Sequence, residues 1–270
     1  MVSINFNKGF PVKSFLVSAL SILSCAQLVA NQSAITAPQK DPESRFQLGG
    51  DYAYVRIKPH GETRTHGNLG GAQAIYEYRA VNRVYGAAAL TWREGKTTGS
   101  GVDRTLVDVD AQERIGYTFA RDDKTARLSV YTGFGYRYLG EKVTTTGSPV
   151  RFNYNEFYVP VGFLLEGKIN STFSMGLNAQ WMPQVYSSVV IKPIGGARWI
   201  LDNQLSNYLL EAPLKITLSQ KHRVHLILSP FIATWHDGHT HAVTETGTAL
   251  NVPKNDYFFA GANVNFCFSF

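Results

Sequence analysis

The sequence predicts an all-β protein, an up-and-down antiparallel β-barrel whose ten strands cross a membrane. Long segments of alternating apolar and polar residues and a short-long alternation in the connections are the first two signs. The third is that no apolar stretch beyond the N-terminal segment approaches the roughly 18 residues of a transmembrane helix. Because only helices and closed barrels satisfy every backbone polar group in lipid, such a chain can span a membrane only as a barrel.

Composition agrees with this fold. Charged residues make up 17% of the 270-residue chain, below the roughly 25% usual in soluble domains, and aromatic residues make up 13%. Together with 24 glycines, this is typical of a barrel that presents apolar side chains to lipid and polar ones to its lumen. The length suffices for one large all-β domain, so no second domain is predicted.

The N-terminal segment has the features of an export signal. Lys8 and Lys13 give it positive charge, residues 15–25 form a short apolar run, and Ser24-Cys25-Ala26 offers small residues for cleavage. We therefore expect a signal peptide at 1–26, a polar periplasmic leader at 27–44 and the barrel at 45–270, with cleavage after Ala30 as the alternative.

The two cysteines bear on processing. Lipidation of Cys25 is an alternative to simple cleavage. Cleavage after Ala26 leaves Cys267 alone, which excludes an intramolecular disulfide, and we expect Cys267 to be a small packed residue.

Ten segments carry the strand signal. In chain order they are about 45–58, 67–80, 84–94, 107–119, 127–138, 156–166, 173–181, 208–218, 222–236 and 256–270. Most are about twice the 5–6 residues of a globular strand, whereas a tilted strand needs about 9–11 residues to cross the hydrocarbon. Length therefore favours spanning strands over a soluble sandwich.

The alternation assigns faces to five of these segments. In 107–119, for example, Val107, Val109 and Ile115 share one face, Asp108 and Arg114 lie on the other, and Glu113 is a misfit. The segments at 127–138, 156–166, 173–181 and 208–218 alternate in the same way, whereas the first, third and ninth leave their faces ambiguous.

The connections give an independent sign. Those near 81–83, 120–125, 168–171 and 219–221 are short, whereas the alternate ones are mostly longer, the largest being 183–205 and 237–255. This is the pattern of periplasmic turns and extracellular loops, and it places both ends of the barrel in the periplasm. We expect 183–205 to continue its strands as a hairpin that turns at 193–196.

Aromatic residues gather at two levels, as expected where rings favour the membrane interface. Trp92, Trp181 and Trp235 each end an outward-going strand, at the level of Tyr136, Tyr138, Phe157, Tyr208 and Phe258. Tyr78, Tyr117, Phe119 and Phe163 fall at the other end.

The chain ends in a seven-step alternation from Phe258 that includes Phe266 and Phe268 and closes on Phe270. It resembles the C-terminal targeting strand of Gram-negative outer-membrane β-barrel proteins, and the segments 158–163 and 226–231 look like strands of small porin-like and opacity-type barrels. The resemblance covers about 45–270. It implies residence in the cell outer membrane and insertion by the barrel-assembly machinery, but no particular activity.

Charges on the predicted inward faces form the main candidate site. They are Asp108, Asp110, Arg114, Arg127, Arg137, Glu156, Glu166, Glu211 and Lys215. Since a low-dielectric lumen cannot hold unpaired charges cheaply, we expect a salt-bridge network that braces a narrow barrel. A small hydrated pore is the alternative, because ten strands lie between filled eight-stranded barrels and wide channels.

Three candidate chemistries are weaker. His236, His239 and His241 could bind zinc or copper, but a solvated loop is the simpler interpretation. Asp108 and Asp110, with the histidine cluster, are similar to the acidic pair and Asp-His pair of omptin proteases only in strand count and residue type. No convincing Ser-His-acid set of a lipid-A-modifying barrel enzyme is present. We predict no catalytic residue, cofactor or metal site.

These observations predict a non-enzymatic outer-membrane barrel, acting as a narrow porin-like channel or as a structural and surface-interaction protein. An omptin-like surface protease or a lipid-modifying enzyme is the alternative. The basic pI of about 9.2 predicts contact with lipopolysaccharide phosphates among the outer-membrane lipids, and no nucleic acid partner is expected.

Overall fold

The computed structural model describes residues 44–61, 63–99, 101–120, 126–145, 149–192, 198–202, 205–243 and 252–270, without the side chains of 241–243. The expected signal peptide and all of the expected leader except Ser44 lie outside these residues. Within them the chain is all-β, and no helix is long and apolar enough to cross a membrane.

The described residues form fourteen strands. They are β1 (Ser44–Pro59), β2 (Thr65–Arg79), β3 (Arg83–Gly99), β4 (Val102–Ala120), β5 (Ala126–Thr144), β6 (Val150–Tyr158), β7 (Val161–Lys168), β8 (Phe173–Lys192), β9 (Arg198–Leu201), β10 (Ser206–Glu211), β11 (Leu214–Ser219), β12 (Val224–Asp237), β13 (Thr240–Val243) and β14 (Asn255–Ser269).

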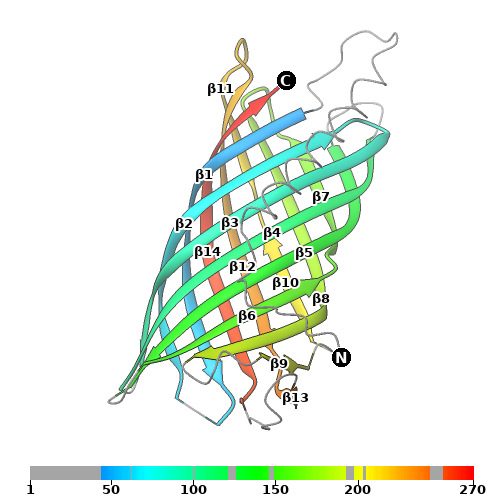
Figure 1. The fold of residues 1–270 in the computed structure, drawn as a ribbon. Coiled ribbons are helices and arrows are strands. Elements are labelled where there is room, and N and C mark those ends of the chain that lie inside the picture. Colours follow the sequence, from blue (N-terminus) through cyan, green and yellow to red (C-terminus); the bar gives the residue numbers. More distant parts are fainter. Residues whose placement is uncertain are drawn as a thin grey trace, which may run out of the picture. The chain divides into compact units, whose positions relative to one another are not determined.

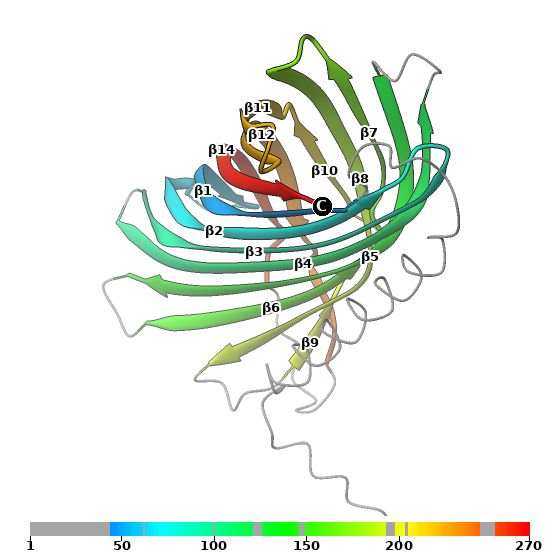
Figure 2. The ribbon, with the colours of Figure 1, turned by 90° about the horizontal axis from the view of Figure 1, so that it is seen from above.

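The strands close into one antiparallel ring (Figures 1 and 2). The order runs from β1 to β5, through β6 with β7, β8, β10 with β11, and β12 to β14, which pairs with β1 again. Because β6 with β7 and β10 with β11 each make one wall position, the ring has ten strands, which confirms the predicted fold class. We call the end with the C-terminus the inner end and the opposite one the outer end.

Two prolines interrupt the wall on either side of β8. Pro160 separates β6 from β7, and Pro213 separates β10 from β11, because proline has no N–H to give to a ladder. Neighbouring backbone groups still pair: Val159 N donates to Pro183 O at 3.1 Å, and Gly176 N donates to Pro213 O at 2.8 Å. The expected strands at 156–166 and 208–218 are therefore each two segments in one position.

Several strands extend further outward than expected. β4 and β5 have 19 residues each and β8 has 20, and a tight turn at Gly101, with φ of 80°, joins β3 to β4 where a longer loop was expected. β9 returns along β8, with Val189 opposite Trp199, as the hairpin prediction requires. The turn at 193–197 lies outside the described residues.

The side-chain alternation is confirmed in β4, β5, β7 and β8. Phe134 and Trp181 are 48% and 45% exposed on the exterior, whereas Arg137 and Gln180 are 2% and 4% exposed inside. Glu113 faces outward among apolar residues, as the alternation along 107–119 predicted. One aromatic prediction is wrong: Trp235 is 5% exposed and points into the lumen, because both faces of β12 carry apolar residues and its phase could not be assigned.

The main apolar core lies inside the outer part of the barrel. Twelve of its side chains are at most 1% exposed, and we call nine of them the outer plug: Val55, Ile57, Leu69, Leu106, Leu139, Val189, Ile191, Trp199 and Leu201. Two of them come from β9, which pairs with β13 outside the ring and, like β13, lies at the outer end (Figure 1).

Candidate functional site: the charged lumen

All nine candidate charges face the lumen, but they do not form one continuous network. They separate along the barrel into a cluster near the inner end around Glu166, a central group around Asp110, and a cluster around Arg137 below the outer plug.

Glu166 of β7 is the centre of the inner cluster. Its carboxylate receives Arg45 Nη1 at 2.7 Å, Arg79 Nη1 at 2.8 Å and Lys215 Nζ at 2.5 Å. These cations come from β1, β2 and β11, so one carboxylate ties together strands that are not neighbours of β7 in the wall. The candidate Arg127 participates through its backbone carbonyl, which accepts a bond from Arg79 Nη2 at 3.1 Å.

Arg137 of β5 is the centre of the outer cluster. Its Nε donates to Asp108 Oδ1 at 2.7 Å, and its Nη1 lies 3.4 Å from Glu156 Oε2. The guanidinium also lies 4.6 Å from the ring centroid of Trp235 and 5.5 Å from that of Tyr257. A buried cation is thus held by two carboxylates and aromatic faces, an arrangement in which each attraction is strengthened by the absence of water.

The carboxylate of Glu156 is fully buried, and neutral donors complete its hydrogen bonding. Trp235 Nε1 donates to Oε2 at 2.5 Å, and Gln184 Nε2 donates to Oε1 at 2.9 Å. Gln184 lies on β8, the wall neighbour of β6, whereas Trp235 lies on β12, so Glu156 ties β12 to β6 across the lumen.

The central group lines a cavity of about 120 Å³. Tyr158 OH donates to Asp110 Oδ2 at 2.8 Å, Asn178 Nδ2 donates to Glu211 Oε2 at 3.0 Å, and Arg114 donates to Gln112. Room for the Tyr158 ring depends on Gly135, where a Cβ would lie 2.1 Å from a ring atom. The cavity is lined by both polar and apolar side chains and has room for a few water molecules.

Sequence reasoning missed several charges that complete these clusters. Arg93 binds Asp51 through Nε at 2.5 Å and Nη2 at 2.9 Å, Arg104 pairs with Glu141, and Arg45 and Arg79 contact Glu166. Most lie on the first three strands, whose faces or inner ends were not assigned. The period-two pattern counted through Gly49 and Asp51 would have indicated the inward face of β1.

The histidine cluster is only partly described. His236 Nε2 lies 3.7 Å from Asp256 Oδ1, and His239 Nδ1 lies 2.9 Å from the carbonyl oxygen of Thr240. The side chain of His241 is outside the described residues. Among the side chains that are described, no group of three or more His, Cys, Asp or Glu is placed to hold a metal ion.

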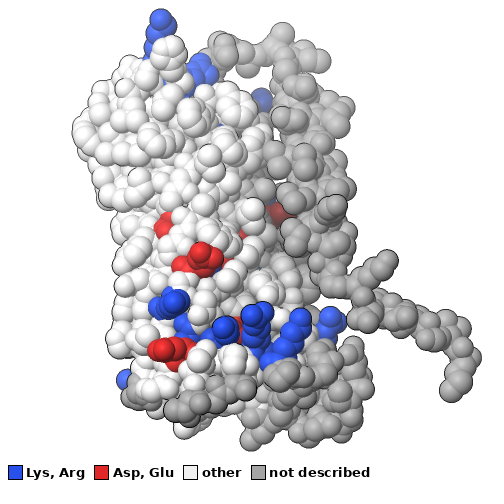
Figure 3. All heavy atoms as spheres, turned by 60° about the vertical axis from the view of Figure 1, so that its left-hand side comes forward, with Lys and Arg blue, Asp and Glu red and all other residues white. Residues whose placement is uncertain are grey.

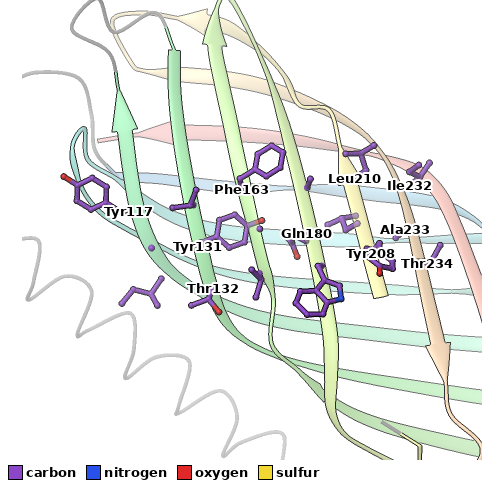
Figure 4. A pocket seen from close by; sticks show the side chains of 18 of the residues that line it. Tyr117, Tyr131, Thr132, Phe163, Gln180, Tyr208, Leu210, Ile232, Ala233 and Thr234 are labelled. Carbon is purple, nitrogen blue, oxygen red and sulfur yellow. The ribbon is translucent and has the colours of Figure 1, made fainter. Parts of the chain in front are cut away.

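The exterior wall carries an apolar depression of about 970 Å³ (Figure 4). Outward-facing side chains line it from β4 to β14, among them Tyr117, Phe163, Tyr208, Leu210 and Ile232. Its large apolar side chains belong to the face that the alternation assigns to lipid, so hydrocarbon is its expected surrounding, whereas Tyr131 and Gln180 reach it from the inward face.

Comparisons with known proteins agree with this architecture. The family model described as "outer membrane protein beta-barrel domain" matches residues 16–182, more than half of the chain. The outer membrane protease OmpT of Escherichia coli has a TM-score of 0.58 at 9% identity, over 87% of this chain and 99% of that one. At this identity the likeness shows the fold alone.

Two further structures are less similar. The translocator domain of the autotransporter NalP of Neisseria meningitidis has a TM-score of 0.44 at 12% identity, over 94% of this chain and 97% of that one. The attachment invasion locus protein Ail of Yersinia pestis has a TM-score of 0.37 at 12% identity, over 84% of this chain and all of that one. No curated protein matches the chain.

Proposed function

Because the chain belongs to the outer membrane protein beta-barrel domain family and its lumen is filled by side chains, we propose that it is a closed structural barrel that displays its outer end at the cell surface. The protein lies in the outer membrane, as its family and fold indicate. The outer plug is the observation that carries the proposal, since ions and polar solutes need a hydrated path.

The energy needed to open the outer plug supports a closed barrel. Fully burying a large aliphatic side chain stabilises a fold by about 1.5–3 kcal/mol, so exposing all nine members would cost on the order of 10 kcal/mol or more. Each 1.4 kcal/mol lowers a population about tenfold, so a barrel with a fully hydrated plug region is too rare to carry a useful flux.

The charge clusters support the same proposal from the inside. Glu166 binds three cations from three strands, and Arg137 binds two carboxylates, so these charges are paired with one another. A conducting lumen would present charges to passing ions. The narrow porin-like channel is therefore the second candidate, favoured only by the central cavity of about 120 Å³ and the charges that line it.

We further propose that the barrel is not an enzyme. An omptin-like mechanism would need acidic groups free to activate water in an accessible groove. Here Asp108 is 3% exposed and binds Arg137, and Asp110 accepts a hydrogen bond from Tyr158. No observation in the described residues favours a lipid-modifying site.

The expected partners follow from the exterior. The apolar wall is proposed to contact outer-membrane lipids and lipopolysaccharide. Phe266 and Phe268 of β14 and Phe270 directly after it are 52%, 45% and 61% exposed on the exterior, and we propose that the barrel-assembly machinery recognises them before ring closure.

Planar-bilayer recording of the refolded protein tests the proposal. The wild-type barrel is expected to be silent, whereas a variant in which Ile191, Trp199 and Leu201 are all replaced by serine should show brief conducting events. Heat-modifiable gel mobility controls for the insertion of both proteins. Reproducible single-channel steps from the wild type would contradict a closed barrel and establish the narrow channel instead.

A further inference from the structure

A row of cations crosses the exterior of three adjacent strands near the outer end. Lys142 of β5 is directly opposite Arg151 of β6, and Arg151 is directly opposite Lys192 of β8. All three side chains are exposed on the outward face. We call these three residues the cation triad.

No acidic side chain lies beside the triad on the outward face of β5, β6 or β8; the acidic neighbour is exposed Asp103 of β4, which is opposite Thr144, two residues beyond Lys142. The triad's outward-facing neighbours on the same strands are Gly140, Thr144, Asn153, Asn155, Ser188 and Val190. Within the described part of the chain, no ion pair involves Lys142, Arg151 or Lys192. Arg198 of β9, opposite Val190, adds a further positive charge one row away.

This arrangement has a cost in the free protein. Like charges directly opposite one another on neighbouring strands repel, because their Cβ atoms are only about 4.5–5.5 Å apart. Figure 3 shows the same trend over a wider area, since Lys and Arg form a belt across this end of the visible face with few Asp or Glu among them. An anion bound across the triad would remove the repulsion.

The level of the triad indicates where that anion lies. Further toward the inner end on the same face of β5, beyond Gly140, lie Tyr138 and Tyr136. The Tyr136 hydroxyl donates to Asn155 Oδ1 at 2.7 Å, and the Tyr138 hydroxyl donates to Asn153 Oδ1 at 3.1 Å. Tyr136 also packs on Phe157, at 5.0 Å between ring centroids. Such rings favour the membrane interface. Lys142 follows Tyr138 by four residues, about 13 Å along a strand, which reaches the head-group level.

We propose that Lys142, Arg151 and Lys192 bind the phosphate groups of an outer-leaflet glycolipid. Arg151 lies in the middle of the triad, where its planar guanidinium can donate two parallel hydrogen bonds to one phosphate. The lysines on either side supply compact charges that can reach the same phosphate or a second one on the same lipid. This inference rests on the outer-membrane location and not on whether the lumen conducts.

Thermal unfolding of the refolded barrel in neutral detergent, with and without lipid A, tests the site. Lipid A with two phosphates should raise the melting temperature of the wild type, and the same lipid without phosphates should not. Replacing Lys142, Arg151 and Lys192 by glutamine should lower the affinity for the phosphorylated lipid roughly fivefold per cation, and on the order of a hundredfold in total.

The matched control replaces Arg83, Lys168 and Lys221, three exposed cations at the inner end, by glutamine. It has the same change of charge and should bind lipid A like the wild type. Equal weakening in both triple variants would reduce the effect to net charge, and unchanged affinity of the triad variant would overturn the site. Displacement of lipid A by millimolar inorganic phosphate would show a free-anion site and overturn the lipid assignment.

A single replacement, Arg151→Glu, covers the case in which the triple variant does not fold. It should still weaken binding of phosphorylated lipid A at least fivefold relative to Arg83→Glu. Equal affinities of these two single variants would also overturn the proposal.

Discussion

Replacing Arg137 by alanine perturbs the most highly connected buried charge of the outer cluster. The side chain is 2% exposed, and its removal leaves Asp108 and Glu156 without their shared cation. Breaking a buried ion pair from one side typically destabilises a protein by about 3–5 kcal/mol.

The contacts around Arg137 place the expected loss near the lower end of that range. Asp108 keeps Arg93 Nη1 at 3.7 Å, and Glu156 keeps hydrogen bonds from Trp235 and Gln184. Losing the contacts with the aromatic rings costs up to about 2 kcal/mol in a site without water, and this cost overlaps with that of the broken ion pairs. We therefore expect Arg137→Ala to lower the free energy of unfolding by about 3–4 kcal/mol while leaving insertion nearly intact.

Urea unfolding of the refolded barrel measures this loss, with intrinsic tryptophan fluorescence and heat-modifiable mobility as two readouts. Arg56→Ala is the matched control, because Arg56 is exposed over the Phe258 ring at 5.4 Å and should contribute less than about 1 kcal/mol. Adding Glu156→Gln to Arg137→Ala should recover part of the loss, since it removes an unpaired charge. A loss below about 1 kcal/mol, or a double variant weaker than the single one, would refute the electrostatic account.

Three further outcomes can be checked. Phe270→Ser should lower the amount of inserted protein several-fold without changing the urea midpoint of the inserted fraction. Quantitative immunoblots of outer membranes measure the inserted amount, and normal insertion would refute a targeting role. An epitope tag within 193–197 should be labelled on intact cells and one at Asp122 should not, whereas surface labelling at Asp122 would invert the topology. Cys267 is fully buried and free, so maleimide should label the mature protein only after unfolding, and rapid labelling of the native barrel would contradict the register of β14.

The sequence predicted the ring and the faces of several strands, because a period-two pattern is a local property. Arg137 and Val130 could be assigned to opposite faces by counting along β5 alone. The register was not available in this way. That Glu166 meets Arg45, Arg79 and Lys215 depends on the stagger of the whole ring, which brings distant strands together at one level.

The strands with ambiguous faces have physical reasons for their ambiguity. β3 carries alanine on both faces, at Ala87 and Ala88, so neither face is distinctly apolar. β12 has Ile227 and Phe231 inside and Ile232 outside, and its inward rings pack against buried cations, Phe231 against Arg93 and Trp235 against Arg137. Trp235 could not be told from an interface residue without knowing that Glu156 lies across the lumen to accept its N–H.

β1 gives the reason that applies to the whole barrel. Near the inner end Phe46 and Leu48 face outward and Gln47 faces inward, whereas near the outer end Arg56 and Lys58 face outward and Val55 and Ile57 face inward. The alternation keeps its phase, but the polarity of the two faces inverts along the strand. A window spanning both halves therefore finds apolar residues on both faces.

In other long strands too, the exterior changes from apolar to polar toward the outer end, so the barrel has two parts with different surroundings. β8 has Met175 and Trp181 outside at the inner part; beyond the irregularity at Gln184–Tyr186, which shifts its phase by one residue, Lys192 lies outside and Val189 and Ile191 lie in the outer plug. A wall that is apolar outside needs lipid around it, and a wall that is polar outside and apolar inside is that of a water-soluble barrel. The strands exceed the roughly 9–11 residues needed to cross a bilayer, so the surplus stands in water. The plug that closes the lumen and the cations at the head-group level are thus two consequences of one change of solvent along the strands.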